Sequence, residues 1–347
     1  MTNNIQIPTK VIGTIKINGN IINEDVYVPL STYELALFPS VSRGAKVSRL
    51  VGGVNTTLIS ETMTRSIILE GKCTADLLKL KKDLLQNKDI ISNVAKISSD
   101  HIKLQDIYVE IIGKLIFIRF SFTTDEASGH NMVTKAVDYI IAWICGNYKN
   151  IKYVSVSGNM CVDKKNSAIN GILGRGRNIV SEITIPESIC KEVLHTTPTK
   201  IHELNIKKNL VGSILAGSVR SANAHFANML LATYLATGQD AANIVEGSQG
   251  TTYTEVLEDG SLYFSVNCPN IIVGTVGNGK NIDFVKKNLA LMGCNDKTKT
   301  HGENAQRLGC IIVSAVLCGE LSLLAAQSTF GALTKAHEKI ERGNKNG

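Results

Sequence analysis

The spacing of apolar residues changes several times between Ile67 and about Val156, and these changes predict alternating helices and strands. CTADLLKLKKDLLQ and NMVTKAVDYIIAWICG have apolar residues at helical spacing, whereas IYVEII, KLIFIRFSF and IKYVSVS are short apolar runs typical of strands. Such alternation is typical of a small α+β domain of the split βαβ type. The residues before about Ser66 instead predict short strands and turns.

Two long apolar segments in the rest of the chain predict helices. Residues Asn223 to Thr237 are apolar around most of the helix circumference and precede Gly238, so we expect a buried central helix that ends at this glycine. A second helix is predicted from Glu303 to about His337, with glycines that permit close helix contacts at Gly309, Gly319 and Gly331. We therefore predict an α+β protein: residues 1–66 and 156–347 form a large domain around the buried helix, and residues 67–155 form an inserted small domain.

The composition restricts the possible partners. A chain of 347 residues with 44% hydrophobic content is long enough for two packed domains. A net charge of +7 suits a polyanionic small molecule such as coenzyme A or a dinucleotide. Aromatic residues make up only 5% of the chain and are not interleaved with basic residues, so nucleic-acid binding is not expected.

The eight cysteines form no CxxC pair and have no histidine partner at metal-binding spacing, so they predict reduced, mostly buried thiols and no metal site. MTNNIQIPTK has no apolar core of a signal peptide. The longest apolar stretch, Cys310 to Ala326, is interrupted by polar residues and is predicted to be too short to span a bilayer. We therefore expect a soluble cytoplasmic protein that does not contact membranes.

The segment SVSGNMCVDKKNSAIN, residues 155–170, combines charged and amide side chains in what is predicted to be an irregular loop. Asp163, Lys164 and Lys165 are consistent either with a solvated turn or with an anion site. A partly desolvated lysine beside a second cation loses proton affinity more readily, and it can stabilise a developing oxyanion. Cys161 in the same loop has no evident base beside it, which favours packing over nucleophilic catalysis.

Five further fragments, read together with this loop, resemble the catalytic domain of the 3-hydroxy-3-methylglutaryl-coenzyme A (HMG-CoA) reductase family. They are STYELALFPSVSRGAK, ETMTR, KKNLVGSILAGS, NAHFANMLLATYLATGQDAANIV and GTVGNGK. The resemblance runs in the order of that family from about Tyr27 to about His337, which lies in LTKAHEKIERG. The resemblance implies a ferredoxin-like nucleotide-binding domain inserted into a larger one. It also implies a homodimer or higher homo-oligomer with active sites at the subunit interface.

The implied reaction is the four-electron reduction of HMG-CoA to mevalonate and coenzyme A by two NAD(P)H, in the mevalonate pathway of isoprenoid synthesis. Two alternatives remain open: catabolic oxidation of mevalonate with NAD, and a noncatalytic relative that binds coenzyme A or a nucleotide. A serine hydrolase is disfavoured because Ser157 does not lie in a GxSxG motif.

The resemblance assigns catalytic roles to four residues. Lys164 would polarise the thioester and aldehyde carbonyls, and Asp240 would keep this lysine charged and raise the pKa of a glutamate. Glu34 would be that glutamate and donate a proton, although Leu35 replaces the usual glycine after it. His337 would protonate the coenzyme A thiolate. Without the resemblance, Asp240 is equally consistent with a helix cap, and a histidine near a helix end is more often a surface residue.

The resemblance also assigns binding residues. The substrate positions are Arg65, Ser157, Asp163, Lys165, Lys208 and Asn228, and the coenzyme A positions are Ser40, Arg43 and His225. The segment TTDEASGHNMVTKA resembles the dinucleotide signature of the family, whose backbone amides receive the pyrophosphate. The cofactor positions are Asp100, Glu126, Ser128, Gly129, Asn131, Met132, Val276, Gly277 and Arg342.

Three positions depart from the family pattern. Asp125-Glu126 replaces the usual Gly-Asp, and Asn278 occupies a position where glycine is common. Asp100 aligns with an arginine that binds the 2′-phosphate in NADPH-dependent relatives. Because a carboxylate repels phosphate but accepts hydrogen bonds from a ribose hydroxyl, the cofactor is either NADPH, as is usual in the family, or NADH, as Asp100 suggests.

Overall fold

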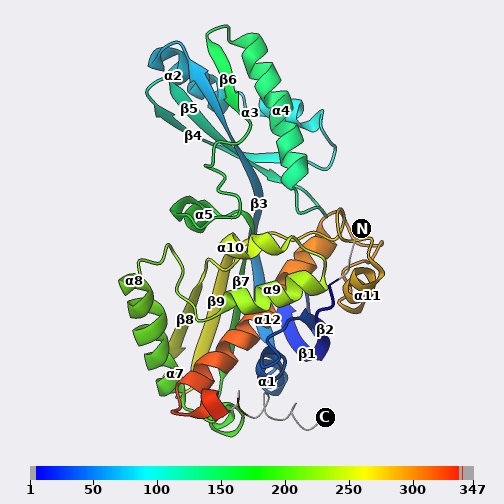
Figure 1. Ribbon diagram of the computed structural model, residues 1–347, viewed down its shortest axis with the longest axis vertical. Helices are drawn as coiled ribbons and strands as arrows, with labels where there is room; N and C mark the ends of the chain where they lie inside the picture. The colour runs from blue at the N-terminus through cyan, green and yellow to red at the C-terminus, as the bar shows by residue number, and fades with distance from the viewer. Residues whose placement is uncertain (1–4, 336–337, 339–347) are drawn as a thin grey trace.

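A long strand, β3 (Val54–Gly71), connects two sheets of this mixed α/β protein. The computed structural model describes residues 5–335 and 338. Figure 1 shows β3 running from the lower part of the molecule into the upper part. It pairs with β7 up to Thr62 and with β5 from Met63 onward, so that one strand belongs to both sheets.

The lower sheet has the order β2-β1-β3-β7-β9-β8. β1 and β3 are parallel, and the other neighbours are antiparallel. Its strands other than β3 are β1 (Thr9–Gly19), β2 (Glu24–Ser31), β7 (Gly176–Ile185), β8 (Thr251–Val256) and β9 (Leu262–Ile271). This sheet and the helices packed on it form one hydrophobic core, which we call the core of the large lobe.

The upper sheet has the order β6-β3-β5-β4 and is antiparallel throughout. Its further elements are β4 (Lys103–Ile112), β5 (Leu115–Thr123), β6 (Ile151–Ser155), α2 (Thr74–Gln86), α3 (Lys88–Lys96) and α4 (His130–Asn147). These elements share a second hydrophobic cluster, to which the large lobe contributes Ile272. We call the part of the chain around this cluster the small lobe.

The helix α12 (Glu303–Gln327) runs through the core of the large lobe, where most of its side chains are buried. It packs against α1 (Leu37–Leu50), β7 and α9 (Phe226–Ala236). The remaining elements are α5 (Ala168–Leu173), α6 (Glu187–Ile189), η1 (Cys190–Leu194), α7 (Pro198–Leu204), η2 (Asn205–Gly212), α8 (Ser213–Leu215), η3 (Ala241–Asn243), α10 (Ile244–Gly247) and α11 (Asp283–Leu291). Among the described residues, α12 is the one helix long and apolar enough to cross a membrane, and 94% of its most apolar window is buried inside the protein, as in a core helix.

Two glycines allow α12 to approach its neighbours closely. A Cβ atom on Gly44 of α1 would lie 2.2 Å from the carbonyl oxygen of Cys318. A Cβ atom on Gly319 would lie 2.4 Å from the sulfur of Met229 in α9. Real Cβ atoms do not approach backbone atoms this closely, so α1 and α12 pack as they do only with glycine at position 44. At position 319 a Cβ atom would instead require the flexible Met229 side chain to move.

The predicted elements of the small lobe are confirmed as α2, α4, β4, β5 and β6, whereas α3 was not predicted. The prediction of strands and turns before Ser66 is wrong for α1. Pro39 in its first turn is compatible with a helix because the N–H groups there have no intrahelical partner. Six of the eight cysteines are buried, as expected.

The predicted bounds of the two apolar helices are corrected by the structure. α9 begins at Phe226, three residues later than predicted, because His225 before it has a non-helical φ of −160°. The side-chain oxygen of Asn223 accepts a hydrogen bond from the Phe226 amide at 3.2 Å. α12 ends at Gln327 rather than near His337, and the Cys310–Ala326 stretch is therefore part of a 25-residue helix. Gly331 does not support a helix contact in the described part of the chain, because its φ of +76° is left-handed and no described atom beyond its chain neighbours lies within 4 Å of its Cβ position.

Candidate active site

The loop between β6 and α5, which holds the two adjacent lysines, has an unusual backbone. Asn159, Val162 and Lys164 have positive φ angles of 55°, 44° and 55°, a conformation that side chains with a Cβ rarely adopt. Three hydrogen bonds stabilise it: Met160 N to Ser66 Oγ at 2.9 Å, Asn170 Nδ2 to the Val162 carbonyl at 2.8 Å, and Lys164 N to Glu246 Oε1 at 3.1 Å. Strained backbone held in this way is frequent at functional sites.

Lys164 and Asp240 form an ion pair, with 2.7 Å between Nζ and Oδ2. The hydrogen bond to Asp240 raises the pKa of Lys164, and burial only partly opposes it. Burial disfavours the charged form of Asp240, but the bonds from Lys164 and from the Ala242 amide outweigh this effect and lower its pKa. The expectation that Lys164 would lose proton affinity beside Lys165 is therefore wrong in direction, because the aspartate is the closer charge.

In the structure Asp240 caps a helix and also contacts Lys164. Its Oδ1 accepts a hydrogen bond from Ala242 N at 3.1 Å and so caps the short helix η3. Its Oδ2 is the atom that contacts Lys164. The cap fixes the carboxylate of Asp240 in place, and this carboxylate holds the ammonium group of Lys164.

A buried arginine lies behind this pair. The Arg175 side chain, 0% exposed, contacts Asp163 Oδ1 at 3.0 Å and Glu246 Oε1 at 2.8 Å. Burial disfavours the charged form of Asp163, but His130 and Arg175 together bring its pKa well below its usual range. Burial raises the pKa of Glu246 despite the arginine.

Arg175 and Glu246 were not predicted from the sequence. Glu246 lies within the otherwise apolar and small-residue run AANIVEG, and a lone acid in such a run is a signal of a buried charge. Cys161, in the same loop, is 1% exposed and contributes to packing, as expected.

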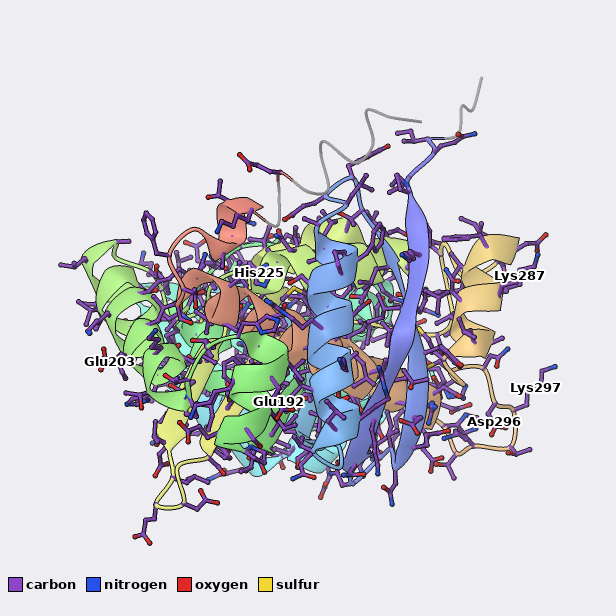
Figure 2. All side chains as sticks on the ribbon, turned by 90° about the horizontal axis from the view of Figure 1, so that it is seen from below. Glu192, Glu203, His225, Lys287, Asp296 and Lys297 are labelled. Atoms are coloured by element: carbon purple, nitrogen blue, oxygen red, sulfur yellow. The ribbon has the colours of Figure 1, made fainter. Side chains whose placement is uncertain are left out.

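Glu34 belongs to a second group of side chains in the large lobe. Asn228 Nδ2 donates to Glu34 Oε2 at 2.9 Å, and the same Nδ2 lies 3.5 Å from His225 Nδ1. His225 Nε2 lies 3.0 Å from the Gly319 carbonyl. Figure 2 shows His225 near the centre of the large lobe, whereas Lys287 and Lys297 lie at its edge.

Glu320 positions this group and was not predicted. It is fully buried in α12 and accepts hydrogen bonds from the amides of Ala224 at 2.6 Å and His225 at 3.1 Å. Its signal in the sequence is that a lone acid interrupts the longest apolar stretch, Cys310 to Ala326.

A cavity of about 700 Å³ adjoins Glu34, His225 and Asn228. Ser40 and Arg43 of α1 line it, and both bind Ser322: the two hydroxyls are 3.1 Å apart, and Arg43 Nε donates to Ser322 Oγ at 3.0 Å. Burial lowers the pKa of Arg43. The structure thus brings all three predicted coenzyme A positions to one cavity. The full lining is Glu34, Ala36, Leu37, Pro39, Ser40, Arg43, His225, Asn228, Ser322, Leu323, Ala326, Ala332 and Leu333.

The remaining predicted substrate residues lie in different parts of the chain. Arg65 in β3 donates to Thr134 Oγ1 in α4 at 2.5 Å. Lys165 Nζ donates to the Asp163 carbonyl at 3.2 Å, and the Ser157 side chain is exposed. Lys208 in η2 donates to Asn209 Oδ1 at 3.3 Å, and burial lowers its pKa.

The predicted cofactor segments lie side by side. Ala127 and Val276 form a parallel bridge, and Thr275 N donates to the Glu126 carbonyl at 2.8 Å. Gly129 precedes α4 with a φ of +92°, and no side chain caps this helix start, so the first amides of α4 are free to bind an anion. The structure therefore brings Ser128, Gly129, Asn131 and Met132 together with Val276 and Gly277.

Three other predicted cofactor residues are placed differently. The Glu126 carboxylate accepts hydrogen bonds from the amides of Gly302, Asn304 and Ala305, at 2.9 to 3.1 Å, and so caps the start of α12. Asp100 is exposed in the turn before β4. Arg342 lies outside the described residues, as does the predicted catalytic residue His337.

Comparisons with known proteins agree on one family. The sequence model of the family described as hydroxymethylglutaryl-coenzyme A reductase matches residues 1–342. The chain is 45% identical to 3-hydroxy-3-methylglutaryl-coenzyme A reductase from Aeropyrum pernix over 98% of this chain and 80% of the relative. It is 42% identical to the protein of the same name from Pyrococcus abyssi, over 97% and 83%.

Solved structures of low sequence identity share the fold. A class II 3-hydroxy-3-methylglutaryl-CoA reductase from Streptococcus pneumoniae, bound to NADPH in open conformations, superposes with a TM-score of 0.75 at 17% identity. The match covers 94% of this chain and 86% of that one.

Proposed function

We propose that this chain, which belongs to the hydroxymethylglutaryl-coenzyme A reductase family, reduces HMG-CoA to mevalonate and coenzyme A with two equivalents of NAD(P)H. The observation that carries the proposal is the Lys164–Asp240 ion pair, held on a strained loop above a buried arginine. The reaction needs a fixed positive charge at a carbonyl oxygen on which negative charge develops twice.

Lys164 supplies that charge. Because its pKa is raised by Asp240, the lysine remains protonated at neutral pH, and its ammonium group donates a hydrogen bond to the thioester oxygen and later to the aldehyde oxygen. Asp163 and Arg175 fix the loop from which Lys164 projects. NAD(P)H, when bound, supplies the hydride in each reduction.

Glu34 donates the proton to the aldehyde oxygen in this proposal, and Asn228 orients its carboxyl group. Among the described residues, no hydrogen bond or ion pair joins Glu34 to Lys164 or Asp240 within one chain. This separation supports a homo-oligomer in which one active site takes residues from two subunits. We assign protonation of the departing thiolate to His337.

The cavity beside α1 is the proposed site for coenzyme A. Arg43 provides positive charge for its phosphates, and the apolar lining residues Leu37, Leu323 and Ala326 contact its carbon chain. Arg65, Lys165 and Lys208 provide cations for the free carboxylate of the substrate, together with the polar residues Ser157, Asp163 and Asn228.

The pyrophosphate of the cofactor would bind at the start of α4, where backbone amides without a side-chain cap would donate hydrogen bonds to it. Ser128, Gly129, Asn131 and Met132 would hold it from the small lobe, and Val276 and Gly277 from the large lobe. We propose that Asp100 shifts the preference from NADPH toward NADH, since its carboxylate repels the 2′-phosphate of NADPH. The other proposed contacts are Glu126 and Arg342.

We propose the domain division 1–66 with 156–347 and 67–155, with a ferredoxin-like small domain. The strand order β6-β3-β5-β4, the alternation of strands with α2, α3 and α4, and a separate hydrophobic cluster support this description. A cytoplasmic location is supported by eight free cysteines.

The function is tested by following the absorbance of NADH or NADPH with HMG-CoA as substrate. We expect two equivalents of cofactor oxidised per coenzyme A released, with mevalonate as the product. Lys164→Ala should lower kcat at least a thousandfold without loss of the fold. Lys191→Ala is the matched control, because this exposed lysine forms an ion pair with the exposed Glu187 on the surface.

Three outcomes would contradict the proposal. Consumption of NAD with mevalonate and coenzyme A as substrates, without measurable reduction of HMG-CoA in the other direction, would favour the catabolic alternative. Binding of coenzyme A without turnover would favour a noncatalytic relative. Full activity of Lys164→Ala would exclude the assigned role of the lysine.

A further inference from the structure

Two histidines and an aspartate meet where the small lobe contacts the large lobe. His101 precedes β4, Asp125 follows β5, and His301 precedes α12. One possible ligand atom from each residue, a ring nitrogen of each histidine and a carboxylate oxygen of Asp125, lies within 4.8 Å of the other two. His101 Nδ1 and Asp125 Oδ2 are 3.0 Å apart, and the rings of His101 and His301 pack edge to face with centroids 5.1 Å apart.

The backbone around Asp125 is fixed. Its φ of +46° lies in the left-handed region, which aspartate tolerates better than most residues. The buried Arg177 donates to the Asp125 carbonyl at 3.1 Å, and a Cβ atom on Gly302 would lie 3.4 Å from Asp125 Cα. These contacts place the segment that carries His301 directly against Asp125.

Asp125 is also one of the positions at which this chain departs from the sequence pattern that it otherwise resembles. Glycine adopts the left-handed backbone without cost, so the conformation does not require an aspartate there. The substitution adds a carboxylate that faces His101. The proposed reduction uses neither this carboxylate nor the two histidines.

We propose that His101, Asp125 and His301 bind a divalent transition metal of the zinc class and that the metal joins the two lobes. Two imidazoles and one carboxylate are a usual ligand set for zinc, with water as the fourth ligand. Donor atoms around tetrahedral zinc are about 3.3 Å apart, as follows from zinc–ligand distances near 2.05 Å. Rotation of the exposed His101 and His301 side chains closes the remaining gap.

The chemistry of the ligands restricts the ion. Magnesium and calcium require mainly oxygen ligands, and this cluster offers only one carboxylate. The sequence did not predict the site, because its three ligands lie in separate segments that only the fold brings together. His101 and Asp125, for example, are 24 residues apart. A metal here would hold the start of α12 to the small lobe, beside the Glu126 carboxylate that caps the same helix.

Zinc chloride alone is the probe, titrated calorimetrically into the full, untagged chain in metal-free buffer. The chain carries Cys73→Ser throughout, because Cys73 is an exposed cysteine that would bind zinc by itself. We expect one equivalent per chain, and we expect His101→Ala, Asp125→Asn and His301→Ala each to raise the Kd at least tenfold. Magnesium should give no binding at the same concentration.

His195→Asn is the matched control. His195 is exposed and has a φ of +58°, which asparagine tolerates, so the variant should fold and bind zinc with an unchanged Kd. Cobalt bound at the site should show visible absorption bands without the near-ultraviolet band of a thiolate ligand. The proposal is overturned if the chain does not bind zinc, or if His301→Ala binds it as tightly as the parent does.

Discussion

The contact between α1 and α12 predicts that Gly44→Ala destabilises the protein. A Cβ atom at this position would lie 2.2, 2.5 and 2.6 Å from three backbone atoms of Cys318. Because backbone atoms in the middle of a helix cannot rotate away, the two helices must separate by about 1.2 Å to restore an ordinary contact of 3.4 Å. Overpacking of this kind costs up to about 3 kcal/mol, from which about 1 kcal/mol of improved helix propensity is subtracted.

The expected net loss is therefore about 2 kcal/mol in the free energy of unfolding, a change of roughly thirtyfold in the equilibrium constant. Gly146→Ala in α4 is the control, because no described heavy atom outside its own helical turn lies within 4 Å of its Cβ position. Since Gly146 lies in the last turn of α4, where only part of the helix propensity of about 1 kcal/mol applies, the substitution should stabilise by about 0.5 kcal/mol. Urea unfolding followed by far-ultraviolet circular dichroism, at one protein concentration, measures both variants. A Gly44→Ala midpoint equal to or above that of the unmodified protein would refute the close contact.

Three further predictions concern the charges of the site. Arg175→Met leaves the buried Glu246 without its cation, so we expect the free energy of unfolding to fall by about 3 kcal/mol or more. The double variant Arg175→Met with Glu246→Gln should recover part of this loss. Equal stability of the single and double variants would contradict the prediction. Because the pKa of Asp163 is lowered in the folded protein, the unfolded chain binds a proton at this residue more readily than the folded one. The ionised Asp163 therefore stabilises the folded protein above about pH 4, and this stabilisation is lost as the pH falls further. Asp163→Asn should make the free energy of unfolding depend less steeply on pH in that acid range. An unchanged slope would contradict the prediction. Asp100→Arg should raise the ratio of kcat/KM for NADPH over NADH at least tenfold in steady-state assays, and a constant ratio would remove Asp100 from the cofactor site.

The elements α2, α4, β4, β5 and β6 of the small lobe were predictable because each one carries its apolar periodicity within a single segment, whereas α3 was missed. α1 was missed because its buried face includes Gly44 and Ser48, which are buried only because α12 and β1 lie against them. No local pattern distinguishes such a face from a turn.

The site was predictable where chemistry and sequence spacing coincide and unpredictable where it depends on burial. Lys164 and Asp240 were identified from their fragments, and the structure places them in direct contact. Arg175, Glu246 and Glu320 support the candidate site from inside the protein. Glu246 and Glu320 interrupt apolar runs in the sequence, but the groups that they bind are brought to them only by the fold. Their roles follow from desolvation, which a linear sequence does not display.

The 18-residue strand β3 makes the two lobes parts of a single hydrogen-bonded framework. Complete unfolding of either lobe would remove hydrogen-bond partners from β3, a strand that also belongs to the sheet of the other lobe. Amide protons of β3 should therefore exchange with solvent among the slowest in the chain, and both lobes should lose their protection in one cooperative event.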